Sequence, residues 1–152
     1  MNNFKISSVD EVVAITLTNV PNLPQSPAQI FAELGAAEVN IDMICQTAPY
    51  KDKINLSFTI DQSDLTATMT VVGKLKDVYG ELITEVGTGC CKFILSGEVL
   101  KTQCGAAARM FKALADNDLQ IKLITTAETE ISILLDNRHY DTALEVLTKE
   151  FI

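Results

Sequence analysis

The chain has 152 residues, a formal net charge of −8 at neutral pH and 47% hydrophobic residues, with no tryptophan. This charge argues against nucleic acid or an anionic membrane as a partner, because both are bound by clustered Lys and Arg. No apolar run approaches the roughly 18 residues of a membrane span, and the N-terminus MNNFKISS does not read as a signal peptide. We therefore expect a folded cytoplasmic protein with neither nucleic acid nor membrane among its partners.

The predicted strands and helices follow a regular order. Apolar periodicity and turn residues predict strands at 4–9, 12–19, 40–46, 53–60 and 82–86, with turns at 10–11 and 48–52 and helices from 27 and from 63 to about 79. The stretch Gly87-Thr88-Gly89 predicts a boundary. Beyond it we expect strands at 91–95, 119–126 and 129–135 and helices at 105–115 and 140–151.

The first predicted helix follows a turn that contains three prolines. Its apolar stripe is Pro27, Ile30, Phe31 and Leu34, at the i, i+3, i+4, i+7 spacing of one helix face. Ser26 is a plausible N-cap, with Pro27 at the first helical position. In the same way, Ser63 is expected to cap the second helix.

The stretch that contains this helix occurs twice. An offset of 80 places Phe31 on Phe111, Leu34 on Leu114 and Ile41 on Ile121. After that the offset falls to 75, with Ser57 on Ser132 and Asp61 on Asp136, so the loop between the strands is five residues shorter in the second copy. A repeat that keeps helices and strands in register predicts two copies of one structural unit.

Each copy is predicted to be a ferredoxin-like βαββαβ unit of the α+β class, with an antiparallel sheet and two helices on one face. The second copy lacks a strand after its last helix, and the spare strand at 4–9 is expected to fill that place. We expect the first unit at residues 10–88 and the second at residues 1–9 with 89–152. Halves of about 75 residues bury marginal cores, so they should pack on each other or on another chain.

Catalytic chemistry finds little support in the residues. The cysteines Cys45, Cys90, Cys91 and Cys104 match no metal spacing, and His139 is the only histidine. The chain has no GxxxxGK[ST] or GxGxxG loop and no plausible nucleophile–base pair. We therefore expect free buried thiols, no metal, no cofactor and no catalytic residue.

A small-ligand site is suggested where the proline-containing turn enters the first helix. Free N–H groups at a helix start suit a carboxylate. The side-chain amides of Asn40 and Gln46, on the following strand, could read an ammonium or a polar side chain. This combination suits a free amino acid. The alternative is that Asn40 and Gln46 are solvated strand or interface residues.

At these residues the chain resembles a known family. ITLTNVPNLPQSPAQIFAELGAAEVNIDMICQ, followed by INLSFTI, is similar to the first regulatory ACT domain of aspartate kinases. The second copy, GAAARMFKAL with LQIKLITTAETEISILL, resembles the second ACT domain of that family. The resemblance covers essentially all 152 residues and does not include the amino-acid kinase domain. It implies a tandem ACT fold, dimerisation through ACT sheets and completion of the second unit by the N-terminal strand.

The resemblance also implies an effector site where two ACT units meet. In the family, lysine or threonine is commonly bound by the turn before the first helix and by the Gln at the end of the following strand. Carried over to this sequence, the effector-binding residues are Asn22, Gln25, Ser26, Pro27, Asn40 and Gln46. Three of them depart from the family pattern, since Asn22 replaces an Asp, Gln25 a Gly and Pro27 a small residue. In the second copy, Cys104 replaces a Pro and Gln120 an Asn.

From these observations we expect an ACT pair of the aspartate kinase type that senses a small amino acid, such as lysine or threonine, in aspartate-family amino-acid biosynthesis. Its expected partners are the amino acid, a second copy of the chain and an aspartate kinase catalytic domain. A pure ACT assembly module that binds no ligand is the main alternative, and an enzyme on a ferredoxin-like scaffold is a third.

Overall fold

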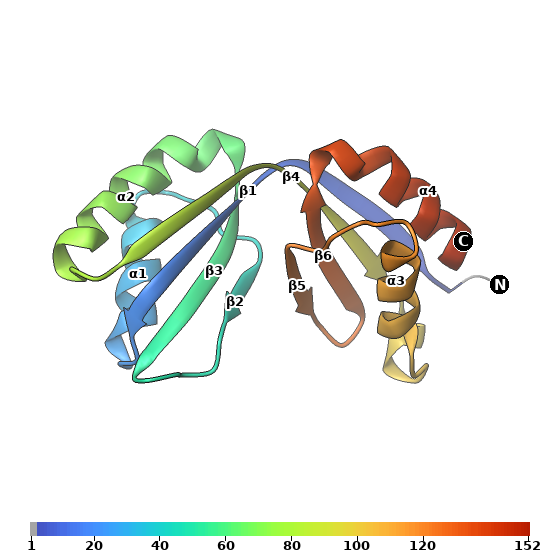
Figure 1. Cartoon of the computed structure of the whole chain (residues 1–152), viewed down its shortest axis with the longest axis horizontal. Helices are drawn as coiled ribbons and strands as arrows, with labels where there is room; N and C mark the ends of the chain where they lie inside the picture. Colours follow the sequence, from blue (N-terminus) through green and yellow to red (C-terminus); the bar gives the residue numbers. More distant parts are fainter. Residues whose placement is uncertain (1–2) are drawn as a thin grey trace. The chain divides into compact units, whose positions relative to one another are not determined.

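The computed structural model describes residues 3–152, which divide into two compact units (Figure 1). The first unit consists of residues 12–88. The second consists of residues 89–152 together with the N-terminal segment up to Glu11. Each unit has an antiparallel sheet with two helices on one face, so the predicted fold class is confirmed.

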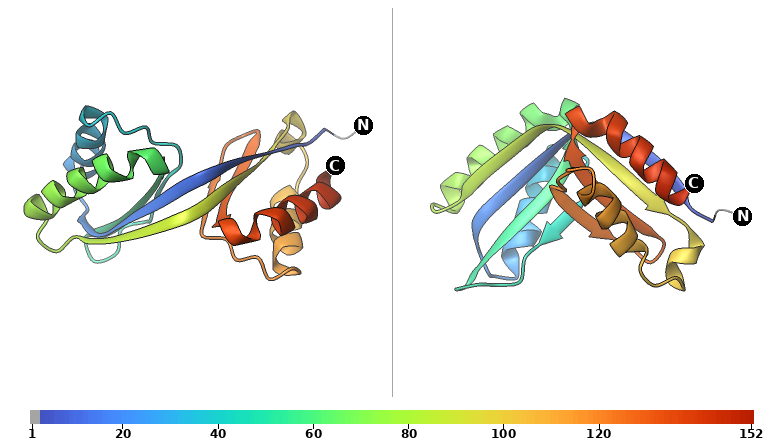
Figure 2. Two further views of the ribbon diagram at one scale, coloured as in Figure 1. Left: turned by 90° about the horizontal axis from the view of Figure 1, so that it is seen from above. Right: turned by 45° about the vertical axis from the view of Figure 1, so that its right-hand side comes forward.

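The first unit has the strand order β2-β3-β1-β4. Its elements are the second half of β1 (Lys5–Pro21), α1 (Gln25–Ala36), β2 (Ile44–Gln46), β3 (Lys53–Asp61), the 3-10 turn Gln62–Asp64, α2 (Leu65–Val78) and the first half of β4 (Ile83–Ser96). Helices α1 and α2 cover the same face of this sheet, and their apolar stripes meet it in one core (Figure 2). That core contains Ile15, Leu17, Ile30, Leu34 and Phe58, all fully buried.

The second unit repeats this order as β5-β6-β4-β1. Its further elements are the 3-10 turn Glu98–Lys101, α3 (Ala106–Ala115), β5 (Leu123–Thr126), β6 (Glu130–Asp136), the 3-10 turn Asn137–His139 and α4 (Tyr140–Phe151). Its core is built from Phe93, Met110, Leu114, Ile133 and Leu147, again on the helix-covered face. No helix within residues 3–152 is long and apolar enough to cross a membrane.

The N-terminal strand belongs to the sheet of the second unit, as predicted. Phe4 packs edge-on against Phe151, with ring centroids 5.1 Å apart. The hydroxyls of Ser8 and Tyr140 are hydrogen-bonded at 2.6 Å. A Cβ atom added to Gly97 would collide with the backbone carbonyl of Asn3, so glycine is required where the N-terminal segment passes.

The predicted turn at 10–11 and the predicted break between the strands at 82–86 and 91–95 are wrong as local structure, although the two units do divide between Thr88 and Gly89, within the stretch expected to separate the copies. β1 continues through Glu11, which has a φ of 53°, and β4 continues through Gly89, which has a φ of 64°. A single left-handed residue redirects an extended chain without ending the strand. Each of these strands therefore contributes residues to both units.

Two predicted caps are also wrong. Helix α1 already begins at Gln25, so Ser26 lies inside its first turn, where its side chain is fully buried. Asp61 takes the capping role expected of Ser63, because its carboxylate accepts the N–H of Ser63 at 2.9 Å. The aspartate precedes the turn, so its side chain reaches forward to the unpaired amide.

The strand expected at 40–46 is shorter than predicted. Only residues 44–46 form β2, opposite Leu56 to Phe58 of β3. Just before β2, the N–H of Met43 donates to the side-chain hydroxyl of Thr59 at 3.0 Å. This N–H therefore bonds to a side chain and not to a backbone carbonyl of β3. The second unit is similar, since β5 covers only residues 123–126 of the predicted 119–126.

Candidate functional site

The loop that enters α1 is held by backbone hydrogen bonds. The N–H of Asn22 donates to the carbonyl of Asp52 at 2.9 Å, which ties the loop to the turn before β3. The N–H of Leu23 donates to Pro21 O at 2.8 Å, and that of Ser26 donates to Leu23 O at 3.1 Å. The start of the helix is therefore positioned by the strand that precedes it and by the β2–β3 connection.

Few amides remain free at this helix start. Pro27 has no N–H, and the N–H of Ser26 is used by Leu23 O. Gln25 N is a first-turn amide for which residues 3–152 supply no backbone acceptor. The first turn contains no acidic side chain, and no side chain of the described residues caps the helix.

The hydroxyl of Ser26 is fully buried and has no hydrogen-bond partner among residues 3–152. A buried polar atom without a partner is unusual and calls for an explanation. Packing does not supply one, because the equivalent position in the second unit is Ala106, which is also buried. The fold thus accommodates alanine here, so packing alone does not explain the buried hydroxyl.

The six residues predicted for the effector site do not all come together. Asn22, Gln25, Ser26 and Pro27 lie at the start of α1. Asn40 follows the other end of α1, where its N–H donates to the carboxylate of Asp64 at 3.3 Å. At about 1.5 Å of rise per residue, the twelve residues of α1 separate the two places by about 18 Å.

Gln46 lies on the edge strand, away from the helix start. It is exposed and stands opposite Leu56, which in turn pairs with Leu17 of β1. The loop to α1 begins at Pro21, four residues further along β1 and thus about 13 Å away along the strand direction. Within one unit, Gln46 and Asn40 therefore lie apart from the other four residues.

The sequence analysis missed a hollow beside the loop. It has a volume of about 340 Å³ and is lined by Asn19, Thr47, Tyr50, Lys51, Lys53 and Asn55. Lys51 and Asp52 both have left-handed backbones, with φ of 50° and 60°, and Lys53 pairs with Glu81 at 3.4 Å. The signal was present in the sequence, because the longer strand-to-strand loop of the first copy provides three of the six lining residues, Thr47, Tyr50 and Lys51.

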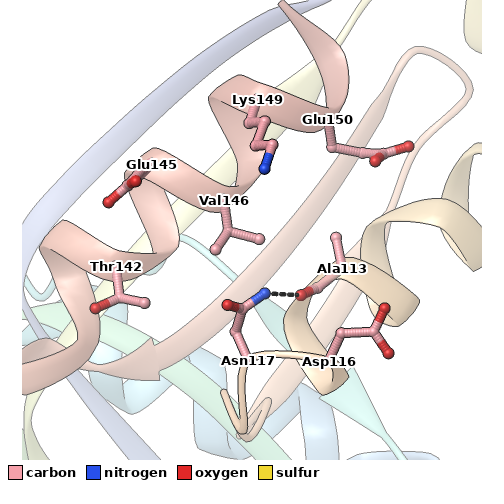
Figure 3. Close-up of a pocket in the computed structure, with 8 residues that line it drawn as sticks. All are labelled: Ala113, Asp116, Asn117, Thr142, Glu145, Val146, Lys149 and Glu150. Carbon is pink, nitrogen blue, oxygen red and sulfur yellow. Dashed lines mark hydrogen bonds between the residues drawn. The ribbon is translucent and has the colours of Figure 1, made fainter.

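A groove between α3 and α4 in the second unit has a volume of about 400 Å³ (Figure 3). Its rim mixes Asp116, Glu145, Lys149 and Glu150, and Asn117 donates to the carbonyl of Ala113 at 2.9 Å. Several of these charges have partners on the same helices, since Lys112 pairs with Asp116 and Arg109 with Glu150. The groove thus mixes acidic and basic side chains, and two of its carboxylates, Asp116 and Glu150, are already paired.

Comparison with known proteins decides the family. The model of the ACT domain matches residues 13–74 and again residues 93–151. The chain belongs to the ACT-domain family. Each match falls within one of the two compact units, so this is a tandem ACT pair.

The relatives of this ACT pair are aspartokinases. The aspartokinase of Bacillus sp. (strain MGA3) is 33% identical over 142 residues, which are 93% of this chain and 34% of that protein. The aspartokinase of Geobacillus stearothermophilus is 32% identical over 148 residues, 96% of this chain and 35% of that protein. The ACT pair thus spans about a third of the length of these curated relatives.

Solved structures show the same arrangement. The ligand-free regulatory subunit of aspartate kinase from Thermus thermophilus shares the fold with a TM-score of 0.89, at 22% identity over 97% of both chains. A chain from a structure of aspartokinase alpha and beta subunits has a TM-score of 0.87 and 27% identity, with 96% of both chains covered. The ACT pair is therefore of the aspartokinase regulatory type.

Proposed function

We propose that this ACT pair regulates an aspartate kinase in response to a small free amino acid, within cytoplasmic amino-acid biosynthesis. The observation that carries the proposal is the two-unit match to aspartokinase regulatory regions over nearly the whole chain. The chain itself would have no catalytic role. The kinase activity would belong to a catalytic domain or to a separate catalytic subunit, and the alpha and beta subunits named for one similar structure support such an association.

We place the effector between two ACT units, in keeping with the geometry of the six predicted residues. One unit would supply the start of α1, with Asn22, Gln25, Ser26 and Pro27. The same unit of a second copy of the chain would supply Asn40, which follows α1, and Gln46 on β2, because both lie too far from that helix start within one unit. The unpartnered hydroxyl of Ser26 and the free N–H of Gln25 would receive the carboxylate.

The site favours an effector with an uncharged side chain. Asn22 and Gln25 are neutral, and the first turn of α1 has no carboxylate to pair with an ammonium. A charge-assisted hydrogen bond contributes about 1.5–3 kcal/mol, so its loss weakens binding about tenfold or more. We therefore expect weak binding of lysine and stronger binding of a polar, neutral amino acid such as threonine.

Regulation requires more than binding. The amino acid must bind one arrangement of the ACT units more tightly than another, because a ligand shifts an equilibrium only by its differential affinity. A shared site meets this requirement in principle, since it is complete only when the contributing units are correctly placed.

A thermal-shift panel of the twenty amino acids tests the proposal. A ligand at about 100 times its dissociation constant adds about 2.7 kcal/mol of stability, which raises the melting temperature by roughly 5–10 °C for a chain of this size. Gln46→Ala and Ser26→Ala should reduce the shift, whereas the exposed control Gln103→Ala should not. An unchanged shift in both variants would place the ligand elsewhere.

Assembly without ligand is the second candidate function, and one observation favours it. Ile44 on β2 and Ile124 on β5 occupy equivalent positions of the repeat and are 51% and 39% exposed. Both strands lie at the ends of the strand order. Exposed apolar edge strands are sites of chain pairing, so a homodimer through ACT sheets is part of this proposal. If no amino acid at about 10 mM shifts the melting temperature, the sensor function fails and this one remains.

A further inference from the structure

A second hollow in the second unit is lined by positively charged side chains. It has a volume of about 390 Å³ and lies where β6 leads through its 3-10 turn into α4. Its lining is Gln120, Ile121, Lys122, Asp136, Arg138 and His139. It is distinct from the start of α3, which is the counterpart of the effector loop.

Two cations of this hollow converge on one carboxylate. Lys122 Nζ lies 3.8 Å from Asp136 Oδ2, and Arg138 Nε lies 3.7 Å from the same oxygen. Arg138 Nε also donates to His139 Nε2 at 3.2 Å. The hydrogen bond from Arg138 N lowers the pKa of Asp136, and the nearby cations lower it further, while burial partly opposes both effects. The net shift is downward, so the carboxylate stays ionised. Two permanent positive charges thus face one negative charge.

The start of α4 adds to this positive field. The helix has twelve residues, and its N-cap His139 makes no side-chain capping bond within the described part of the chain. Unpaired N–H groups at a helix start attract anions. Asp141, the acidic residue of the first turn, is exposed and does not line the hollow.

The repeat shows that the fold does not require these cations. Asp61 and Asp136 have the same structural role, since each accepts the N–H of the residue two positions on, at 2.9 Å and 3.0 Å. The corresponding residues of the first unit carry no positive charge. The positions of Lys122, Arg138 and His139 correspond in the first unit to Asp42, Ser63 and Asp64.

We propose that this hollow binds a small oxyanion, the carboxylate or phosphate group of a metabolite, between Lys122 and Arg138. The excess positive charge, the hollow of about 390 Å³ and the helix start all favour this ligand class. In a chain with a net charge of −8, such a local excess of cations is the condition for holding an anion. The inference goes beyond the amino-acid sensor, because it assigns a different ligand class to the second unit.

The first test locates binding. The isotope-labelled chain is titrated with inorganic phosphate and, separately, with succinate, and sodium chloride keeps the ionic strength constant. We expect saturable amide shifts at Lys122 and from Arg138 to Tyr140. If only phosphate saturates these shifts, the hollow is a phosphate site. If only succinate does, it is a carboxylate site. If both do, the hollow binds oxyanions of either kind. Shifts that do not saturate by about 10 mM, tenfold above a millimolar dissociation constant, overturn the proposal, as do shifts centred elsewhere.

The second test separates the site from general charge effects. Lys122→Gln and Arg138→Ser should each weaken binding about tenfold, as expected for the loss of a charge-assisted hydrogen bond. Lys101→Gln is a matched control, because Lys101 is 38% exposed against 39% for Lys122, is also paired with a carboxylate, and loses the same charge. Equal weakening in the control would overturn the proposal.

Two features keep the test decisive. Arg138 is 75% exposed, and its equivalent in the first unit is a serine, so Arg138→Ser should fold even if Lys122→Gln does not. Lys122→Gln should also leave any thermal shift by amino acids unchanged. Failure of the oxyanion site is thereby distinguishable from failure of the amino-acid sensor.

Discussion

Removing the apolar contacts of the N-terminal strand should destabilise the second unit. The perturbation is the double substitution Phe4→Ala with Ile6→Ala. Both side chains are partly buried and pack against the core of that unit. Phe4 in addition makes the edge-on ring contact with Phe151, which is itself fully buried.

The expected loss follows from these contacts. Truncation of a fully buried Phe to Ala costs about 3–5 kcal/mol and that of Ile about 2–5 kcal/mol. Partial burial roughly halves both values, so the double variant should lose about 2.5–5 kcal/mol in total. For a chain of about 150 residues, each kcal/mol lowers the melting temperature by about 2–4 °C, so we expect a fall of roughly 5–20 °C.

Thermal unfolding followed by circular dichroism measures this change. Val9→Ala is the matched control, because Val9 lies on the same strand but is exposed, and such substitutions usually change stability by less than about 0.5 kcal/mol. A double variant that melts within the range of this control would refute our reasoning. It would mean that the N-terminal strand lies in the sheet without contributing to its stability.

Three further predictions follow from single positions. Gly97→Ala should lower the melting temperature, because its Cβ would meet the N-terminal backbone, whereas Gly73→Ala in α2 meets no atom within 4 Å and should add about 0.5–1 kcal/mol. Burial raises the pKa of the Cys91 thiol from 9.0 to about 11, so the thiol loses its proton at lower pH in the unfolded chain than in the folded one. The free energy of unfolding, measured in urea, should therefore fall as the pH rises between these values. Cys91→Val should remove this pH dependence. Sedimentation at micromolar concentration should show a species larger than the 16.6 kDa monomer. Ile44→Glu should shift it toward the monomer, whereas the control Val78→Glu, at a residue of α2 that is 57% exposed, should not. A parent chain that sediments as a monomer would contradict the pairing of ACT sheets.

The fold could be predicted from the sequence because its signals are periodic and doubled. The stripe of Ile30 and Leu34 recurs as Met110 and Leu114, and all four side chains are fully buried. A strand missing after the last helix required a substitute, and residues 4–9 were the spare strand available. Both inferences rest on apolar patterns that one face of a sheet or helix imposes on the sequence.

The predicted ends of strands and helices were wrong where a single residue departs from the usual preference of its type. Asp10 and Glu11 read as a turn, but a single left-handed residue let β1 continue. The position of Ser26 inside the helix could not be read from composition either, because serine is favoured at the N-cap, one step earlier. Its burial depends on the packing of α1 against the sheet, which sequence periodicity does not specify.

The effector residues were the least predictable part. Residues close in sequence at the start of α1 stay together, but Asn40 is separated from them by the length of that helix. Residues at the two ends of one helix cannot line the same site within one unit. Under our proposal they line it together only because two copies of the unit contribute, and a sequence does not show which residues come from different copies.

Comparing equivalent residues of the two units distinguishes positions that the fold constrains from positions available for ligand binding. Phe31 and Phe111 keep their place because each packs beside its core. Ser26 corresponds to Ala106 and both are buried, so packing at this position does not require the hydroxyl. Likewise, the aspartate that caps the 3-10 turn before the second helix is kept in each unit, while the neighbouring Asp42 corresponds to the basic Lys122. Positions that the fold leaves free have thus diverged in opposite directions, as expected if the first unit receives an amino acid and the second an oxyanion.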